Sequence, residues 1–299
     1  MATGNVALRQ ILEEPIKGSS LWRDAGHRLL RNPSAMVGLF FVGLFVFVAV
    51  LAPMISPYDP TAGSIIHRFE PPSVQHLLGT DLQGRDILSR IIWGARSSLW
   101  VSILSVTMGL AIGLFVGAIS GFLGGWVDFW VMRGVDVMLS MPGLLLTITI
   151  VVFIGPGLNT IAFAIAVENV PIFARLLRSS ILGLKESDFV MAARSVGTKE
   201  ARILITHIMP NALTPVIVAA TLALATAIVD AAGLGFLGFG PQDPATPDWG
   251  TMLTDTYRYL TSGAGFTAFF PGIAIVMSVV GFNLLGDGLR EALDPRLKR

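Results

Sequence analysis

The sequence contains no cysteine, only four histidines and few charged residues. The absence of cysteine excludes disulfide bonds, thiolate metal sites and thiol nucleophiles. Charged residues make up 14% of the 299 positions, whereas an ordinary soluble domain carries roughly 25%. The net charge of +1 provides no basic surface of the kind that binds nucleic acid. The four histidines are too scattered along the chain to indicate a metal cluster: His27, His67, His76 and His207.

Enzyme signatures are absent from the sequence as well. The pattern G-x-x-x-x-G-K-[ST] fails at Gly197-Thr198-Lys199, because Glu200 follows and no glycine precedes Gly197 by five positions. The patterns H-E-x-x-H and G-x-S-x-G do not occur. We therefore predict a non-catalytic chain with no cofactor or metal of its own, so that any ATP is bound by another chain. The alternative, an intramembrane enzyme, would carry a catalytic Ser/His pair, paired aspartates or metal ligands within the membrane.

Hydrophobic residues make up 53% of the sequence and gather in long runs. A helix that crosses a membrane needs about 20 mostly apolar residues. The sequence therefore predicts an all-α integral membrane protein with six spans. A break at Gly155-Pro156-Gly157 separates the third span from the fourth. The expected spans are 35–53, Ser98 to about Ser120, Val137 to Ile154, Leu158 to about Ala174, Pro210 to about Ala232, and 269–285.

The lysines and arginines predict how these spans are oriented. With a cytoplasmic amino terminus, 16 of the 21 basic residues fall on the inner side of the membrane and five on the outer side. This asymmetry follows the positive-inside rule. We therefore expect both termini in the cytoplasm, with outer loops at 54–97, 155–157 and 236–267.

This map divides the chain into five segments. Segment 1–34 is cytoplasmic, 35–53 is the first span and 54–97 is extracytoplasmic. A core of five helices follows over 98–288, and 289–299 is a cytoplasmic tail. Within the first segment, apolar residues at helical spacing between Trp22 and Leu30 predict a helix that lies in the membrane interface. A polar tail that becomes ordered only near its end is the alternative.

Four glycines repeat at every fourth position of the second span. They are Gly109, Gly113, Gly117 and Gly121. Because this spacing places them along one stripe of a helix, the backbone of a neighbouring helix can approach closely. We predict tight helix packing at this stripe, with a flexible gating helix as the alternative.

Two acidic residues lie within predicted spans. Asp230 is near the outer end of the fifth span, and Glu168 is in the cytoplasmic half of the fourth. Ionisable groups in spans usually face a water-filled interior or pair with another polar group. Together with Asn283 of the sixth span, they are candidate residues of a translocation path. A structural hydrogen bond or ion pair is the alternative role.

The cytoplasmic loop 186–208 carries two amphipathic patterns. Apolar residues repeat at i, i+3, i+4 and i+7 in each. Gly197 ends the first helix, and Thr198 is expected to cap the second. An apolar helical face without a cover of its own is suited to a groove of a partner protein; a loop folded back on its own helices is the alternative. The two sets are Phe189, Ala192, Ala193 and Val196, then Ala201, Leu204, Ile205 and Ile208.

The same loop resembles the EAA loop of ABC importer permeases. That motif reads Glu-Ala-Ala, three residues, Gly, and a Leu-Pro ending, and here Met191-Ala192-Ala193, Gly197 and Pro210 match it. Met191 stands where the family usually has Glu, and His207 stands where the general motif has Ile. In the family this loop supplies the coupling helix that lies in a cleft of the ATPase subunit. The resemblance implies ATPase contacts at Phe189, Met191, Ala192, Ala193, Val196, Gly197, Ala201, Leu204, His207 and Pro210.

Other segments are similar to one branch of that family. His207-Ile208-Met209-Pro210-Asn211 is close to the His-Ile-Leu-Pro-Asn sequence of the peptide and nickel importer branch. Three segments in order resemble the C-type permease subunit of that branch. They are Gly79–Arg96, Phe236–Gly240 with Trp249–Leu253, and Asn283–Arg296.

The resemblance implies a type I importer permease in the bacterial cytoplasmic (inner) membrane. It implies a heterodimer with a homologous permease, two ABC ATPases that bind ATP and Mg²⁺, and an external solute-binding protein. The chain would form half of a path for short peptides (di- or oligopeptides), with nickel or another small solute as the alternative cargo. A secondary transporter that works without an ATPase is a further alternative.

Overall fold

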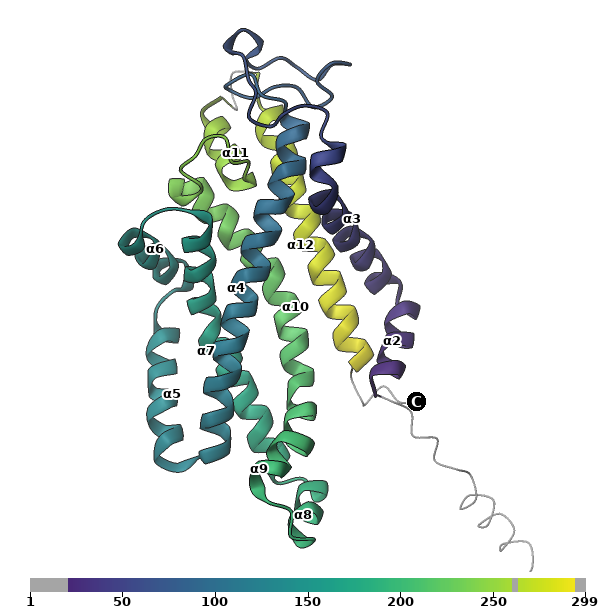
Figure 1. Ribbon diagram of the computed structural model, residues 1–299, viewed down its shortest axis with the longest axis vertical. Helices are drawn as coiled ribbons and strands as arrows, with labels where there is room; N and C mark the ends of the chain where they lie inside the picture. The colour runs from purple at the N-terminus through teal and green to yellow at the C-terminus, as the bar shows by residue number, and fades with distance from the viewer. Residues whose placement is uncertain (1–20, 260–262, 294–299) are drawn as a thin grey trace, which may run out of the picture.

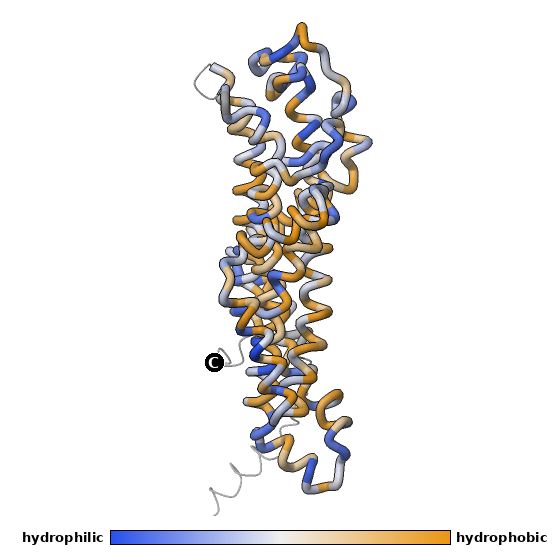
Figure 2. The backbone as a smooth tube through the Cα atoms, turned by 90° about the vertical axis from the view of Figure 1, so that its left-hand side faces the viewer, coloured by the Kyte–Doolittle hydropathy of each residue, from blue (hydrophilic) through white to orange (hydrophobic). Residues whose placement is uncertain are grey.

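A computed structural model of the chain describes residues 21–259 and 263–293. Within these ranges the regular structure is helical, apart from two isolated β-bridges, Gly63 with Arg85 and Thr80 with Asp86. The long helices lie side by side in an elongated bundle (Figure 1). Hydrophobic residues predominate along its middle, and hydrophilic residues gather toward its ends (Figure 2). The predicted all-α membrane protein is confirmed.

Five helical segments are long and apolar enough to cross a membrane. They are α3 (Pro33–Ile55), α4 (Ile87–Leu123), α7 (Leu158–Lys185), the continuous segment Glu200–Phe239, and α12 (Phe266–Leu293). A sixth span results if α5 (Gly125–Ser140) and α6 (Gly143–Ile154), which meet at 91°, together form one span. The long segment Glu200–Phe239 consists of α9 (Glu200–Ile203), η2 (Leu204–Ile208), α10 (Met209–Leu234) and η3 (Gly235–Phe239). The short helices are α2 (Leu21–Arg31), η1 (Ile65–His67), α8 (Asp188–Ser195), α11 (Trp249–Thr256) and η4 (Tyr257–Tyr259).

The third span is not the continuous helix that we expected from Val137 to Ile154. Met141 has extended backbone angles, φ −89° and ψ 135°, and Pro142 precedes α6. A residue before proline is disfavoured in the helical conformation, and proline has no N–H to continue the hydrogen bonding. The chain therefore turns sharply at this point, as the bend between α5 and α6 shows (Figure 1).

The other helices extend beyond the bounds expected from hydrophobicity. The helix α4 begins at Ile87 rather than Ser98, because the side chain of Asp86 caps it by accepting from the backbone N–H of Ser89. The helices α7 and α12 continue to Lys185 and Leu293. Polar and charged residues continue a helix outside the hydrocarbon region, where an apolar pattern gives no signal.

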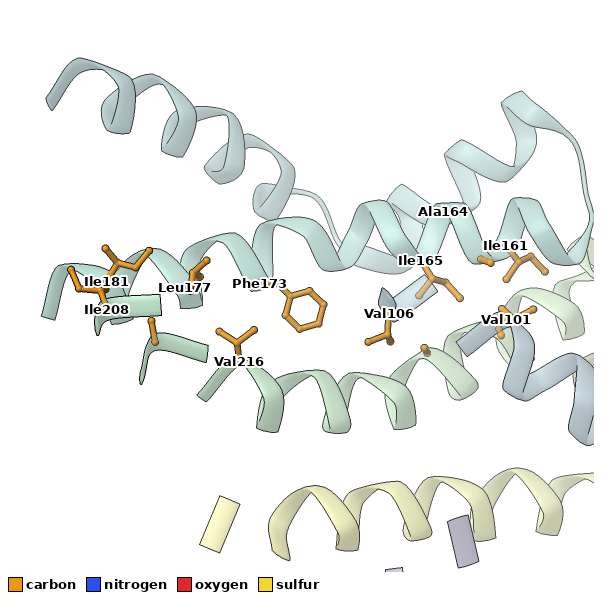
Figure 3. Close-up of a cluster of buried hydrophobic side chains, with 14 of the residues drawn as sticks. Val101, Val106, Ile161, Ala164, Ile165, Phe173, Leu177, Ile181, Ile208 and Val216 are labelled. Carbon is orange, nitrogen blue, oxygen red and sulfur yellow. The ribbon is translucent and has the colours of Figure 1, made fainter. Parts of the chain in front are cut away.

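The first core lies where α4, α7 and α10 meet. Its side chains project from α7 toward the other two helices (Figure 3). Phe173, Leu177 and Ile181 of α7 are fully buried there, with Val106 of α4 and Val216 of α10 beside them. This cluster holds together the helices that also carry Glu168 and Asp230.

The second core lies toward the opposite end of the bundle from α8 and α9. Trp249 of α11 is fully buried and donates its indole N–H to the carbonyl of Ile91, at 3.1 Å. Gly94 makes room for the ring, because a Cβ there would lie 2.7 Å from Trp249 Cδ1. Helix α11 and the segment between α3 and α4 lie at this end of the molecule (Figure 1).

Candidate functional site

The loop between α7 and α10 forms one end of the molecule (Figure 1). Helix α8 ends at Ser195, and Gly197 follows with φ +80°, a conformation that favours glycine. The N–H groups of Gly197 and Thr198 donate to the carbonyls of Arg194 and Ala193, which closes the turn. The expected helix stop at Gly197 is therefore present, whereas Thr198 is not the cap of the next helix, because Lys199 occupies that position.

An ion pair fixes α8 against α9. Arg194 Nε lies 2.7 Å from Glu200 Oε1, and a second nitrogen of the same guanidinium donates to Oε2 at 3.2 Å. The hydrogen bonds from Arg194 lower the pKa of the Glu200 carboxyl. Because both side chains are exposed, the pair adds little to the free energy of folding, and its main effect is to orient α8 relative to α9.

The apolar residues of the loop divide into an inward set and an outward set. Val190, Ala193, Ile203 and Ile208 are buried in the first core. The outward set, which we call the outward patch, consists of Phe189, Met191, Val196 and Ile205, with the exposed Ala192 and Ala201 between them. The side chain of Val196 is 81% exposed. The inward set agrees with the loop folded back on its own helices, whereas docking of the outward patch into a partner stays a prediction. Ala193, expected on the partner-facing side, is instead buried in the first core.

The second helix of the loop is continuous with the fifth span instead of ending before Pro210. Its turn over Leu204–Ile208 is π-helical, with the N–H of Met209 donating to the carbonyl of Leu204. A wider turn at this point accommodates Pro210, whose ring would clash with the carbonyl four residues earlier in a regular helix. His207 Nδ1 lies 2.6 Å from the hydroxyl of Thr206, and Leu204 packs against the first core. Helices α9 and α10 are thus parts of one continuous helical segment.

The glycine stripe of α4 lies against α7. A Cβ on Gly109 would lie 2.8 Å from the carbonyl oxygen of Ala166, and one on Gly113 would lie 2.6 Å from Phe173 Cβ. The same construction at Gly117 meets the carbonyl oxygen of Ala174 at 2.5 Å, and at Gly121 it meets Ile181 Cβ at 3.1 Å. These contacts lie within the chain itself, so the stripe joins two of its own helices.

Glu168 lies beside the bend between α5 and α6. Its carboxyl occupies the space where a side chain of Gly143 would be, and its Oε2 atom is buried without a hydrogen-bond partner among the described residues. Glu168 lies in the first half of the helix α7, and its place relative to the two sides of the membrane stays a prediction. Asp230 lies on α10, which packs against α7, whereas Asn283 of α12 is exposed.

A buried charge cluster at the opposite end was not recognised as a site from the sequence. Arg85 Nε donates to Asp81 Oδ2 at 2.7 Å, and both side chains are buried. Two other nitrogens of Arg85 lie 2.7 Å from the carbonyl oxygen of Pro244 and 3.6 Å from Asp255 Oδ2 of α11. Arg90 Nε lies 3.5 Å from Asp81 Oδ2. The cluster thus joins the segment before α4 to the loop before α11; the i, i+4 spacing of Asp81 and Arg85 was the available signal.

Two carboxyls of this end have raised pKa values. Burial raises the pKa of Asp248, and hydrogen bonds from Thr251 and Gly250 oppose the shift only in part. Burial also raises the pKa of Asp255, against the attraction of Arg85 and Arg90. Asp248 has a structural role as well, because its Oδ2 caps α11 by accepting from the N–H of Thr251 at 2.9 Å.

Two family profiles match this sequence. One is described as "binding-protein-dependent transport system inner membrane component" and matches residues 109–299. The other is described as "N-terminal TM domain of oligopeptide transport permease C" and matches residues 20–72.

Named relatives match nearly the whole chain. The dipeptide transport system permease protein of Alkalihalophilus pseudofirmus is 46% identical over 286 residues, which is 96% of this chain and 93% of the relative. The di/tripeptide transport system permease protein of Pseudomonas aeruginosa is 42% identical, with 96% and 94% of the two chains covered. Among solved structures, a chain of the MetNI methionine ABC transporter in an inward-facing conformation superposes with a TM-score of 0.57. That likeness covers 70% of this chain and 98% of the other at 22% identity, and it concerns the fold alone.

Proposed function

The chain belongs to the family of binding-protein-dependent transport system inner membrane components, and from this membership we propose that it forms half of a membrane path for short peptides. It is a permease subunit of the ABC importer class, of the C type of the dipeptide and oligopeptide branch. The observation that carries the choice of substrate is the 42–46% identity, over nearly the whole chain, to permeases named for dipeptides and tripeptides.

The complete importer contains partner chains. The other half of the path comes from a homologous permease, and an external solute-binding protein delivers the peptide. Two ABC ATPases bind ATP and Mg²⁺, since this sequence contains no phosphate-binding loop of its own. The importer lies in the bacterial cytoplasmic membrane with both termini of this chain in the cytoplasm, as the distribution of basic residues supports.

The outward patch is the surface on which an ATPase subunit acts. Its exposed apolar side chains, Phe189, Met191, Val196 and Ile205, form a helical face suited to a groove. The inward residues Ala193 and Leu204 join this face to the first core, and Gly197 sets the angle between its two helices. His207 and Pro210 lie in the π-helical turn that connects α9 to α10. Closure of the ATPase dimer would therefore move α10, and the path would open to the outer side.

Glu168 and Asp230 are the proposed polar residues of the path. They lie on α7 and α10, which pack against each other. A carboxylate inside a membrane protein is stabilised by a water-filled interior or by a cationic partner, and a peptide in transit carries an ammonium group. Asn283 of α12 is exposed on this chain. It would line the path only if this surface of α12 faces the partner permease.

The proposal is tested by uptake of a labelled dipeptide into proteoliposomes that contain the complete transporter. Val196→Asp places a charge on the outward patch, and the cost of desolvating it in an apolar groove weakens docking. We expect normal membrane levels, loss of ATP-driven uptake, and ATP hydrolysis that no longer responds to loaded binding protein.

A conservative variant and two cargo controls complete this test. Val196→Ile keeps the surface apolar and should transport as the wild type does. Uptake that persists without ATP would support a secondary transporter, and uptake of nickel in place of the dipeptide would support the alternative cargo. Wild-type uptake by Val196→Asp would mean that the outward patch does not couple ATP hydrolysis to transport.

A further inference from the structure

An open cavity of about 450 Å³, lined by both charged and apolar surface, lies where the first and last parts of the described chain meet. Helix α2 lies beside the end of α12 (Figure 1). The cavity is bounded by the last turn of α2, the start of α3 and the end of α12. Its lining residues are Arg28, Arg31, Asn32, Pro33, Glu291 and Ala292.

Two arginines of this cavity have no acidic partner. Arg28 and Arg31 are three residues apart on α2, so their side chains emerge on the same side of the helix. Among residues 21–259 and 263–293, neither forms an ion pair, although Glu291 lines the same cavity. The two guanidinium groups are therefore available for an anion that comes from outside the chain.

The third charge of the cavity is already fixed in place. Glu291 Oε2 accepts a hydrogen bond from Asn32 Nδ2 at 2.5 Å. The side-chain oxygen of Asn32 in turn accepts from the N–H groups of Ser34 and Ala35 and thereby caps α3. Asn32 thus orients the carboxylate of Glu291 toward the cavity, and Oε1 remains free of hydrogen bonds to the described residues.

The position of the cavity along the bundle is that of lipid headgroups. The apolar span α3 begins at Pro33, one of the lining residues. On α2 the side chain of Leu30 is 61% exposed beside the two arginines. An exposed leucine next to unpaired arginines, at the end of a spanning helix, is typical of a helix in the interface between headgroups and acyl chains.

We infer that this cavity binds the headgroup of phosphatidylethanolamine from the surrounding membrane. Arginine holds phosphate through paired, charge-assisted hydrogen bonds, and basic pockets beside spanning helices are known sites for phospholipid headgroups. The free oxygen of Glu291 accepts from the ammonium group of ethanolamine. Phosphatidylcholine has the same charges but no N–H donor, and phosphatidylglycerol has no cation for Glu291.

The inference is tested by native mass spectrometry of the complete transporter in detergent with equal amounts of phosphatidylethanolamine, phosphatidylglycerol and phosphatidylcholine. The double variant Arg28→Gln/Arg31→Gln should lower the affinity for phosphatidylethanolamine about tenfold, because both phosphate contacts are lost. The variant Lys199→Gln/Arg202→Gln removes the same charge from exposed positions of the loop before α10 and should bind this lipid as the wild type does.

Glu291→Gln separates headgroup recognition from folding. This variant keeps an oxygen for Asn32 but loses the charge, so we expect phosphatidylethanolamine to lose its preference over phosphatidylcholine while total lipid binding persists. Equal retention of the two lipids by the wild type, or unchanged binding in the arginine variant, would overturn the inference. Displacement of the lipid by millimolar inorganic phosphate would overturn it too, since it would identify a site for the free anion.

Discussion

Ionisable side chains are buried in this protein under two different conditions. Asp81 and Arg85 satisfy each other at 2.7 Å, and the backbone carbonyl of Pro244 accepts a further hydrogen bond from Arg85. Glu168 has no such partner within residues 21–259 and 263–293, and its carboxyl lies against the backbone of Gly143. A buried pair with its hydrogen bonds made fixes a structure, whereas a buried group without a partner indicates a function or a strained contact.

Gly143→Ala should destabilise the bend between α5 and α6, because the added methyl group would overlap Glu168 Oε1. Overpacking in a rigid core costs about 1–3 kcal/mol, and we expect the lower end here, because the carboxyl is the far end of a flexible side chain that can move aside. Glu168→Ala removes the overlapping carboxyl, so the double variant Gly143→Ala/Glu168→Ala should recover most of the loss. Thermal unfolding of the wild type, the two single variants and the double variant gives the coupling free energy between the two positions. Additive changes in stability would show that the two residues do not meet.

Asp248→Asn should change how stability depends on pH. Because burial raises the pKa of Asp248, the folded protein binds this proton more tightly than the unfolded chain does. The stabilisation is complete below the unfolded pKa of about 3.9 and is lost as the pH rises through the folded pKa. Asparagine keeps the cap on Thr251 without the charge, so Asp248→Asn should gain melting temperature relative to the wild type as the pH rises from about 4. A constant difference, or one that shrinks with pH, would contradict this.

At the scale of elements, α4 and α7 behave as one unit. The four glycines of the stripe, Gly109, Gly113, Gly117 and Gly121, meet α7 so closely that an added Cβ would lie at or below 3.1 Å from a neighbouring atom. Close backbone contact of this kind is how helices associate within a membrane, where the hydrophobic effect does not drive them together. In the proposed function this pair would serve as the fixed part against which α10 moves.

Gly113→Ala should therefore destabilise the subunit itself by about 1–3 kcal/mol, through overpacking against Phe173. Gly134→Ala is the matched control, since Gly134 lies in the interior of α5 with no atom within 4 Å of the added Cβ. That substitution should be neutral or stabilising, because alanine favours helix more than glycine does. Melting of the purified complex compares the two, and equal melting temperatures would show that α4 does not need the close contact.

The apolar runs that a bilayer requires predicted the spanning helices, but they gave no information about the polar segments outside the membrane. Apolar runs predicted the spans, and short motifs predicted the family. A glycine between two amphipathic patterns predicted the helix stop at Gly197, where the structure has a positive φ. The start of α4 at Ile87 was missed, because the cap of Asp86 on Ser89 sets it and the polar residues there, among them Arg90 beside the buried Asp81, interrupt the apolar run. The inward placement of Ala193 was missed because spacing defines a face but not its neighbours.

At the scale of the whole molecule, the two ends of the helical bundle have different proposed surroundings. Helices α8 and α9 form one end, and the segment before α4 and helix α11 lie at the opposite end (Figure 1). In the proposed function the first end binds the ATPase in the cytoplasm and the second faces the outer medium. The sequence contains no cysteine, so a single introduced cysteine is the only thiol of the chain and can be labelled specifically to test this orientation.

Labelling of intact cells with a membrane-impermeant maleimide tests the orientation. Val74 lies between α3 and α4 and is 97% exposed, and Val196 is comparably exposed at the other end. Val74→Cys should react in intact cells, whereas Val196→Cys should react only after the membrane is permeabilised. The reverse pattern would show that the positive-inside rule had been applied in the wrong sense.

The most direct test of the central claim, that the outward patch of this chain binds an ABC ATPase, is photo-crosslinking from a single cysteine. A benzophenone maleimide on Val196→Cys should crosslink in membranes to a protein that carries a Walker motif, identified by mass spectrometry. Val190→Cys, six residues earlier on α8 and fully buried, should give no such product. A Val196→Cys probe that crosslinks only to lipid, or to the ATPase no more than Val190→Cys does, would contradict the account.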